Sequence, residues 1–431
     1  MPMKTGQMAT LAALSVSNLL LSFLFQWYVV TFLGSGWQTD ALFAAMVVPN
    51  LVLAVVSSSL THVLVPVLST RHGKAFEEDA WMYFYLVGSF FIVASILLVL
   101  FDGIWLPLLL PGFSNEELKL TIDIFEIQVF SIVGASLVAV LEAASHAKLK
   151  FYNVEIIKNI VGMIAFLALA LTIDEHGIYA AALIFALRPI LSVFLLLRHL
   201  GKLTHPKIQW EEIKAVWHKL KYLIAGTTYY KTDPLLDRFL LSMATTGSIT
   251  LYHMVQQIYS AGSAIINRAV AAPMVPVLAR HAAAEDWKTF RSDYLKRFIL
   301  ISTFSLCILV LIYFVGEFFL GILFHHGNFD ENSISKMWTL MLALSGIFVA
   351  GSAGQILSSS YYAYGNTKTP THIGILGYTL GIVLKFAGFY YYSVTGVAIA
   401  ASAYYVFNAI FLYIFLEKQI GKKIAAMEEP T

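Results

Sequence analysis

The sequence is poor in charge and nearly without cysteine. Charged residues make up 13% of its 431 residues, whereas a soluble domain carries about 25%. Its hydrophobic share of 58% exceeds the roughly 45–50% that is usual in soluble domains. A single cysteine, Cys307, excludes an intramolecular disulfide and a zinc cluster built from cysteines. These scarcities predict an integral membrane protein.

Motifs for hydrolytic chemistry are also missing. The chain has no Gly-rich phosphate loop ending in Gly-Lys-Ser/Thr, no HExxH and no GxSxG. His325 and His326 are adjacent on one loop and lack a third ligand nearby, so we expect no metal site. The positive residues lie in short loops and form no patch, which argues against nucleic acid as a partner. We therefore expect neither catalytic residues nor a cofactor, and transport would need an ion gradient, the membrane potential or consumption of the substrate downstream.

Long apolar runs separated by charged or turn residues predict twelve transmembrane helices. About 20 residues cross a bilayer, and the period-two alternation of membrane strands is absent. The predicted helices cover residues 8–33, 40–69, 80–101, 121–143, 151–172, 178–198, 218–243, 247–278, 297–322, 337–364, 371–392 and 395–417. The expected fold class is an all-α polytopic membrane protein.

The placement of lysine and arginine predicts the orientation. Twenty of these 28 residues fall in segments on the side of the N-terminus, and only Lys119 and Lys336 fall in the opposite loops. Cytoplasmic loops are enriched in Lys and Arg. We therefore expect both termini to face the cytoplasm and the chain to lie in the cell inner (cytoplasmic) membrane.

A polar break and a short repeat divide the chain into two halves. The break is RHLGKLTHPKIQWEEIKAVWHKLK (198–221), whose two tryptophans fit either an amphipathic surface helix or a solvated linker. The repeat is VPVLSTRH (65–72) and VPVLARH (275–281), at the end of the second helix of each half. We predict an N-terminal six-helix lobe at 1–199, a cytoplasmic linker at 200–217 and a C-terminal six-helix lobe at 218–431. Halves of six helices run parallel, with a cavity between them near mid-membrane.

Charged residues inside the predicted helices are the candidate sites. A charge at membrane depth costs about 2.5–3.5 kcal/mol on insertion scales, so it faces a partner or a wet cavity. The cations at depth are Lys158, Arg188, Lys231, Arg238, Arg268 and Lys385, and the acids are Asp123, Glu126, Glu142, Asp233, Asp237 and Glu317. A cavity that gathers the cations would suit a phosphate or pyrophosphate. Arg188, near the middle of its helix and followed by Pro189, is the strongest candidate. The alternative is internal pairing, for instance of Lys385 with Asp237.

Five segments carry a family resemblance. They are LGSGWQTDALFAAMVVPNLV (33–52), LLLPGF (108–113), DRFLLSMATTGSIT (237–250), ILFHHGNFD (322–330) and YYAYGNTKTP (361–370). In this order, over nearly the whole chain, they resemble the MurJ/MviN lipid II flippases of the MOP exporter superfamily. The resemblance implies two six-helix lobes around a central cavity, alternating inward- and outward-open states, and export of a lipid-linked sugar. It adds Asp40 and Asn50 of the first segment to the candidate substrate site.

The resemblance also implies an ion-coupling site. Asp237 matches an acid of the seventh helix that helps bind sodium in some members of the family. Asp233 and Lys385 join it as candidates, because the ammonium of Lys385 would take the place of the ion. The expected coupling ion is Na⁺ or H⁺.

Departures from the family concern its arginines. Lipid II flippases carry arginines in helix 1, after the Pro-Asn of helix 2 and in helix 8. Here helix 1 has none, Pro49-Asn50 is followed by LVLAVV, and the helix 8 position is Gln256 or Gln257. The cations stand instead at Arg188, Lys231, Arg238 and Arg268, with Lys158 as a further candidate. This favours a lipid-linked saccharide other than lipid II, for an exopolysaccharide or an O-antigen-like polymer.

The function predicted is flipping of a polyprenyl-diphosphate-linked saccharide across the membrane, with membrane lipids around the prenyl tail. A cation-coupled multidrug antiporter of the same superfamily is the alternative, and its cavity should carry net acidic charge. An intramembrane glycosyltransferase or polymerase would need a large outside loop with catalytic groups, whereas the outside loops here are short. A non-transporting scaffold would not need so many buried charges.

Overall fold

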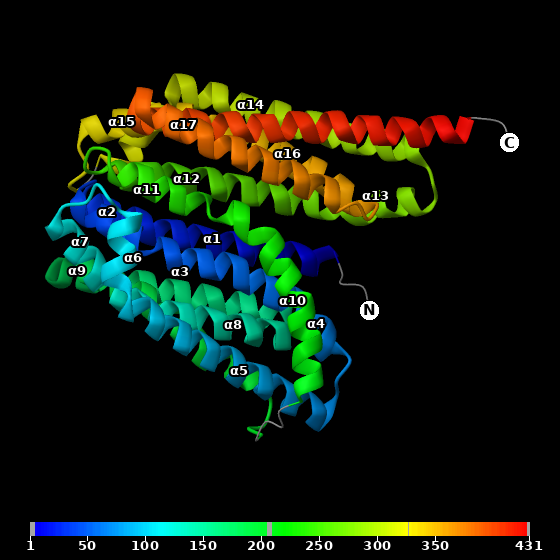
Figure 1. The fold of residues 1–431 in the computed structure, drawn as a ribbon, viewed down its shortest axis with the longest axis horizontal. Helices are drawn as coiled ribbons and strands as arrows, with labels where there is room; N and C mark the ends of the chain where they lie inside the picture. Colours follow the sequence, from blue (N-terminus) through cyan, green and yellow to red (C-terminus); the bar gives the residue numbers. More distant parts are fainter. Residues whose placement is uncertain (1–4, 205–208, 326, 429–431) are drawn as a thin grey trace. The chain divides into compact units, whose positions relative to one another are not determined.

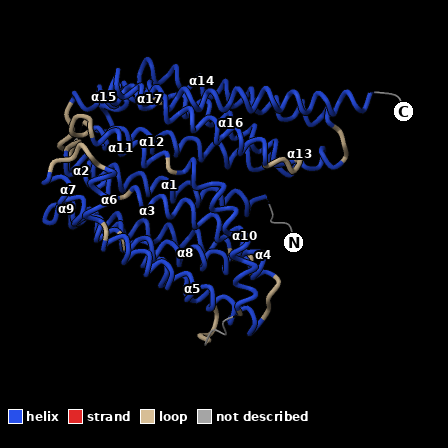
Figure 2. Tube along the Cα trace, in the orientation of Figure 1, coloured by secondary structure: helices blue, strands red, loops and turns tan. Residues whose placement is uncertain are grey.

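The computed structural model describes residues 5–204, 209–325 and 327–428. These residues form helices joined by short loops, and no strand occurs among them (Figure 2). Within the described ranges, nine helical stretches are long and apolar enough to cross a membrane. The all-α prediction is confirmed, whereas the count of twelve spans and the side of each terminus stay predictions.

Two of these stretches each contain two helices. In α9 (Phe151–Leu196) the break falls at Gly177, with φ 53° and ψ −129°. In α17 (Lys368–Glu428) it falls at Ser393, with φ 50° and ψ −133°. Both breaks coincide with predicted gaps between helices. Near the second break the backbones approach closely, because a Cβ added to Gly388 would lie 2.4 Å from the carbonyl oxygen of Gly396.

The chain forms two compact units, Met1–Thr250 and Leu251–Thr431. The first unit contains α1 (Thr5–Leu33), α2 (Trp37–Ala45), α3 (Val47–Val52), the π-helix η1 (Leu53–Ser57), α4 (Ser58–Ser69), α5 (Gly73–Leu100), α6 (Asp102–Leu109), α7 (Asn115–Gln128), α8 (Phe130–Ala147), α9, the 3₁₀-helix η2 (Leu197–His199), α10 (Trp210–Lys231) and α11 (Asp233–Ser242). Within it α9 packs against α8 and α1, and α8 also packs against α4 and α5 (Figure 1).

The second unit begins within α12 (Ser248–Ile266). It continues with the π-helix η3 (Asn267–Ala271), α13 (Ala272–Ala283), α14 (Trp287–Phe324), α15 (Glu331–Ala343), α16 (Ser345–Ala363) and α17. Here α16 packs against α17, α14 and α13. The helices α10 and α11 belong to the first compact unit, and the division into lobes at 1–199 and 218–431 with a linker at 200–217 stays a prediction.

Several helices start earlier than hydropathy predicts, because polar capping residues set their first turns. α14 begins at Trp287, ten residues before its predicted start, and the Asp286 side chain accepts from the backbone N–H of Thr289 at 3.1 Å. This hydrogen bonding lowers the pKa of Asp286. α7 begins at Asn115 behind a capping box in which Ser114 and Glu117 bond each other's backbone N–H groups. Hydropathy marks the segment that lipid surrounds, whereas caps mark the end of the hydrogen-bonded helix.

The sequence repeat corresponds to a repeated local structure. η1 precedes α4, which contains Pro66, and η3 precedes α13, which contains Pro276. Both α4 and α13 are 12 residues long. π-Helices within α-helices are rare and are frequently found at functional sites. The end of η1 and the start of α4 also line the cavity described next.

Candidate functional site

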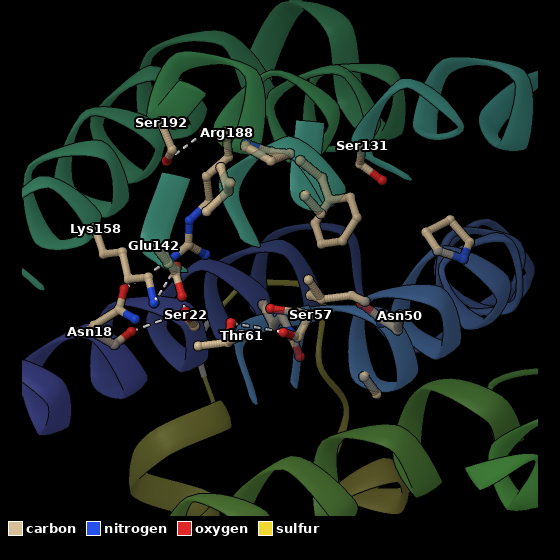
Figure 3. A pocket seen from close by; sticks show the side chains of 18 of the residues that line it. Asn18, Ser22, Asn50, Ser57, Thr61, Ser131, Glu142, Lys158, Arg188 and Ser192 are labelled. Atoms are coloured by element: carbon tan, nitrogen blue, oxygen red, sulfur yellow. Dashed lines mark hydrogen bonds and ion pairs between the residues drawn. The ribbon is translucent and has the colours of Figure 1, made fainter. Parts of the chain in front are cut away.

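A cavity of about 670 Å³ lies in the first unit, among α1, α3 to α4, α8 and α9 (Figure 3). Most of its polar side chains carry amide, hydroxyl or imidazole groups, namely Asn18, Ser22, Gln26, Asn50, Ser57, Thr61, His62, Ser131 and Ser192. Its charged side chains in the described part of the chain are Glu142, Lys158 and Arg188. Two cations and one acid give this lining a net positive charge. The volume lies within the range of about 300–1,000 Å³ that is usual for ligand pockets.

Arg188 extends from α9 toward α1 (Figure 3). Its Nη2 donates to Oγ of Ser22 at 2.9 Å and to Oδ1 of Asn18 at 3.2 Å. Both acceptors are uncharged, and no carboxylate within the described ranges forms an ion pair with this guanidinium. The guanidinium packs beside Gly162, where a Cβ would lie 3.4 Å from Nη2. The arginine is therefore positioned without being neutralised.

The path of α9 brings Arg188 to the cavity. Pro189 has no N–H, so it cannot donate to the carbonyl of Phe185 and loosens the helix there. Gly134 of α8 faces this turn, because a Cβ on it would lie 3.0 Å from the backbone nitrogen of Ile190. The close approach of α8 and α9 places their polar residues on one cavity.

Lys158 and Glu142 form an ion pair on the same cavity. Nζ of Lys158, from α9, lies 2.7 Å from Oε1 of Glu142, from α8, and their side chains are 28% and 12% exposed. Both residues are among the predicted charges at membrane depth, and the structure places them on one cavity with Arg188 and Asn50. Lys158 is thus partnered, whereas Arg188 keeps its full charge for a ligand.

Two other predicted cations lie elsewhere in the first unit. Nζ of Lys231, in the last turn of α10, donates to the carbonyl oxygen of Ala54 within η1. Arg238 of α11 is buried, and its Nε donates to the carbonyl oxygen of Phe43 at 3.4 Å. Neither side chain is among those that line the cavity, so their role in substrate binding stays a proposal.

Asp40 is engaged by the turn before α12. Its Oδ2 accepts from the backbone N–H of Gly247 at 2.6 Å, and its Oδ1 accepts from the backbone N–H of Thr250 at 2.7 Å and from the Thr250 hydroxyl at 2.6 Å. Gly247 is required there, because its φ is +87° and a Cβ would lie 2.9 Å from the carbonyl oxygen of Ser35. The carboxylate is 4% exposed. This geometry favours a structural role for Asp40 over contact with substrate.

The remaining predicted residues lie apart from the cavity. Asp237 is fully buried and Asp233 half-buried in α11 of the first unit. In the second unit Lys385 is fully buried, with Nζ 5.6 Å from the ring centroid of Tyr404. Gln256 and Gln257 are half-buried in α12, and Arg268 is exposed in η3. The ion-coupling set and the pairing of Asp237 with Lys385 stay predictions.

No group of three His, Cys, Asp or Glu side chains within the described ranges is arranged to hold a metal ion. His325, one of the adjacent histidines, ends α14 as its C-cap. His326, the other, lies outside the described residues.

Sequence analysis missed the polar face of α1. Asn18, Ser22 and Gln26 all line the cavity. They are spaced four residues apart, which places them on one face of a helix. A search for uncharged polar residues at this spacing within an apolar run would have found them, whereas attention to charge alone could not.

Comparison with known proteins shows the family. The family model described as lipid II flippase MurJ matches residues 29–428. The probable lipid II flippase MurJ of Vibrio cholerae is 25% identical over 225 residues, which cover 51% of this chain and 42% of that protein. That of Haemophilus influenzae is 26% identical over 234 residues, which cover 52% of this chain and 45% of that protein. The chain thus matches less than half the length of these two relatives. That of Buchnera aphidicola is 20% identical over 420 residues, covering 94% and 82%.

Solved structures show the same fold. A lipid II flippase MurJ in an inward closed conformation has a TM-score of 0.84 at 18% identity, covering 96% of this chain and 90% of that one. An inward-facing multidrug resistance MATE family transporter of the MOP superfamily has a TM-score of 0.80 at 11% identity, covering 96% of both chains. These two matches show that the chain has the all-helical fold of MurJ and MATE proteins. Because the family match spans nearly the whole chain, the protein belongs to the lipid II flippase MurJ family, as the five segments indicate.

Proposed function

We propose that the protein flips a polyprenyl-diphosphate-linked saccharide across the cell inner membrane by alternating access, for synthesis of the cell envelope or an exopolysaccharide. Membership of the MurJ family supports this class of substrate. The prenyl tail stays among membrane lipids, while the head group passes through the protein. The family is one of transporters, so no catalytic residue is assigned.

The main support for the proposal is the position of Arg188 on the cavity and the neutral groups that hold it there. A guanidinium presents a planar fork of donors that matches phosphate oxygens. Arg188 is held at the cavity by two neutral acceptors, Ser22 and Asn18, so its charge is available to a diphosphate. A diphosphate at Arg188 would exchange these neutral contacts for a charge-assisted pair.

The neutral part of the lining suits a saccharide. Asn50, Thr61 and His62 offer both donors and acceptors, as sugar hydroxyls require. Arginine at 188 replaces the arginines expected in helix 1 and after Pro49-Asn50. We therefore assign a lipid-linked saccharide other than lipid II. Na⁺ or H⁺ is the proposed coupling ion, with Asp237, Asp233 and Lys385 as its candidate site.

The test is reconstitution into liposomes with fluorescent polyprenyl-diphosphate oligosaccharides, scoring the fraction accessible on each face. Arg188→Ala should abolish flipping and weaken binding about tenfold to a hundredfold, since a hydrogen bond to a charged group contributes about 1.5–3 kcal/mol. Arg188→Lys should retain part of the activity. Arg280→Ala, at an exposed arginine near the end of α13, is the matched control and should flip normally. Equal flipping by wild type and Arg188→Ala would contradict the proposal.

A cation-coupled multidrug antiporter is the second candidate, because the MATE fold matches with a TM-score of 0.80. A cavity for cationic drugs should be lined by excess acid, and this lining carries two cations to one acid. Export of a cationic dye by the reconstituted protein, without flipping of any lipid-linked saccharide, would favour the antiporter.

A further inference from the structure

A site that only binds an anion does not need the ion pair of Glu142 with Lys158. Glu142 is the one carboxylate on the cavity lining within the described part of the chain. Its Oε1 lies 2.7 Å from Nζ of Lys158, so this ammonium is not available to a ligand. The negative charge of Glu142 also repels a phosphate. A purely anion-binding site would be stronger without it.

Glu142 is surrounded by groups that stabilise or respond to its charge. On the cavity it shares the lining with Lys158 and Arg188 of α9 and His62 of α4, and His146 lies one turn further along α8. The polar side chains that α1 contributes to the lining are all uncharged. Glu142 therefore lies among cationic and hydrogen-bonding side chains.

The other elements packed against α8 carry their charges elsewhere. In α5, Asp79 pairs with Arg71, Glu78 with Lys74, and Glu77 accepts from the backbone N–H of Lys202. In α7, Asp123 accepts from the Tyr179 hydroxyl, and Glu126 is exposed. In η2, His199 contacts Asn153, and Arg198 is exposed. α3 and η1 contain no titratable side chain. The charged and titratable groups near Glu142 are therefore Lys158, Arg188, His62, His146 and Glu155 of α9, which lies close enough to His146 to act on it.

An anion beside Arg188 changes this balance. Its negative charge opposes the carboxylate of Glu142 and competes for the ammonium of Lys158, whose flexible stem lets it change partner. A proton taken up from the acid form of the buffer in bulk solution, and added to a carboxylate oxygen of Glu142, removes the repulsion and releases Lys158. Two cations and a neutral carboxylic acid, which is a hydrogen-bond donor, then face the anion.

We propose that Glu142 is a proton-binding site coupled to the anionic head group: the diphosphate binds together with one proton, and Lys158 passes from Glu142 to the phosphate. This inference rests on the proposed function and deepens it. By linkage, proton and anion strengthen each other's binding by the same factor. The proton also compensates one negative charge of the anion that crosses the membrane, so each cycle carries less net charge.

The test is calorimetric binding of a farnesyl-diphosphate-linked N-acetylglucosamine to the detergent-solubilised full chain, in buffers of different ionisation enthalpy at one pH. The dependence of the observed heat on that enthalpy measures protons taken up. On binding the ligand, wild type should take up as much as one proton. Its affinity for the ligand should fall by up to about tenfold for each pH unit of increase, which is the limit for one linked proton. Glu142→Gln should bind with no uptake and no such pH dependence. Glu142→Asp should keep the uptake.

Glu126→Gln, at an exposed acid of α7, is the matched control and should behave as wild type. Binding by wild type without proton uptake, or with the same uptake in Glu142→Gln, would overturn the proton site and leave the proposed function intact. Absence of binding by wild type would overturn both. Should Glu142→Gln not fold, the infrared difference spectrum of wild type decides: a protonated-carboxyl band must appear on binding, and its absence rejects the proposal.

Discussion

Two buried acids of the first unit, Asp40 and Glu142, are held in different ways. Asp40 accepts from two backbone N–H groups and one hydroxyl, all in the turn at 247–250. Among the residues that the structure describes, Glu142 pairs with one flexible side chain, that of Lys158, beside a cavity. Backbone donors move only when the turn itself opens, whereas a lysine can rotate to another partner. Burial alone therefore does not distinguish the two acids, whereas the kind of donor that holds each one does.

The largest effect in the comparison of Asp40 with Glu142 is expected from substitution of Asp40. Asp40→Ala leaves the N–H groups of Gly247 and Thr250 without their acceptor, and we expect a loss of about 3 kcal/mol or more, since each unsatisfied buried group costs about 1–3 kcal/mol. The measurement is thermal unfolding in detergent. Asp40→Asn keeps one acceptor and should lose less. Normal melting combined with lost flipping would instead place Asp40 in the substrate path, and the contrast with Glu142 would fail.

The second test concerns the ion pair of the cavity. Lys158→Met alone leaves Glu142 charged without its lysine and should cost about 1–2 kcal/mol, less than the 3–5 kcal/mol of a fully buried pair because the lysine is partly exposed. Adding Glu142→Gln should recover most of that loss, because two neutral side chains need no partner. A double-mutant cycle on unfolding free energies measures the coupling. Additive effects of the two substitutions would mean that the pair contributes nothing to stability.

The smallest effect is expected at an ion pair away from the cavity. Lys74 pairs with Glu78 one turn along α5 at 3.7 Å, and the two side chains are 82% and 22% exposed. Lys74→Met should change the free energy of unfolding by no more than about 0.5 kcal/mol, as for exposed pairs on one helix, and the effect should shrink in high salt. The measurement is thermal unfolding in detergent at low and high salt. A change as large as that of Lys158→Met would show that exposure does not separate the two pairs.

Much of the fold was predictable because a bilayer imposes one simple rule. Apolar stretches must be helical to satisfy their own backbone, so the predicted gaps at 173–177 and 393–394 correspond to the breaks at Gly177 and Ser393. Short α6 was missed, since its eight residues are too few to span a membrane. Helix starts were also missed where caps lie outside the apolar segment, as at Asp286.

The candidate site was predictable only in part. Depth within a helix pointed to Arg188, which lines the cavity. The same reasoning also made Lys231 a candidate, yet that lysine contacts a carbonyl of η1. The resemblance placed Asp40 with the substrate, whereas its oxygens are engaged by a turn more than 200 residues away in sequence. Burial cost shows that a charge needs a partner but does not say which one.

By itself the sequence determined that the chain is an all-helical membrane protein of the MurJ family, because hydropathy and local motifs act over short distances along the chain. Only the tertiary structure decided which charges meet. Lys158 forms an ion pair with Glu142, and Arg188 donates hydrogen bonds to Ser22 and Asn18, because α9 packs against both α8 and α1. Ion pairs depend on distance in space, and in a bundle that distance is set by helix packing between segments far apart in the chain.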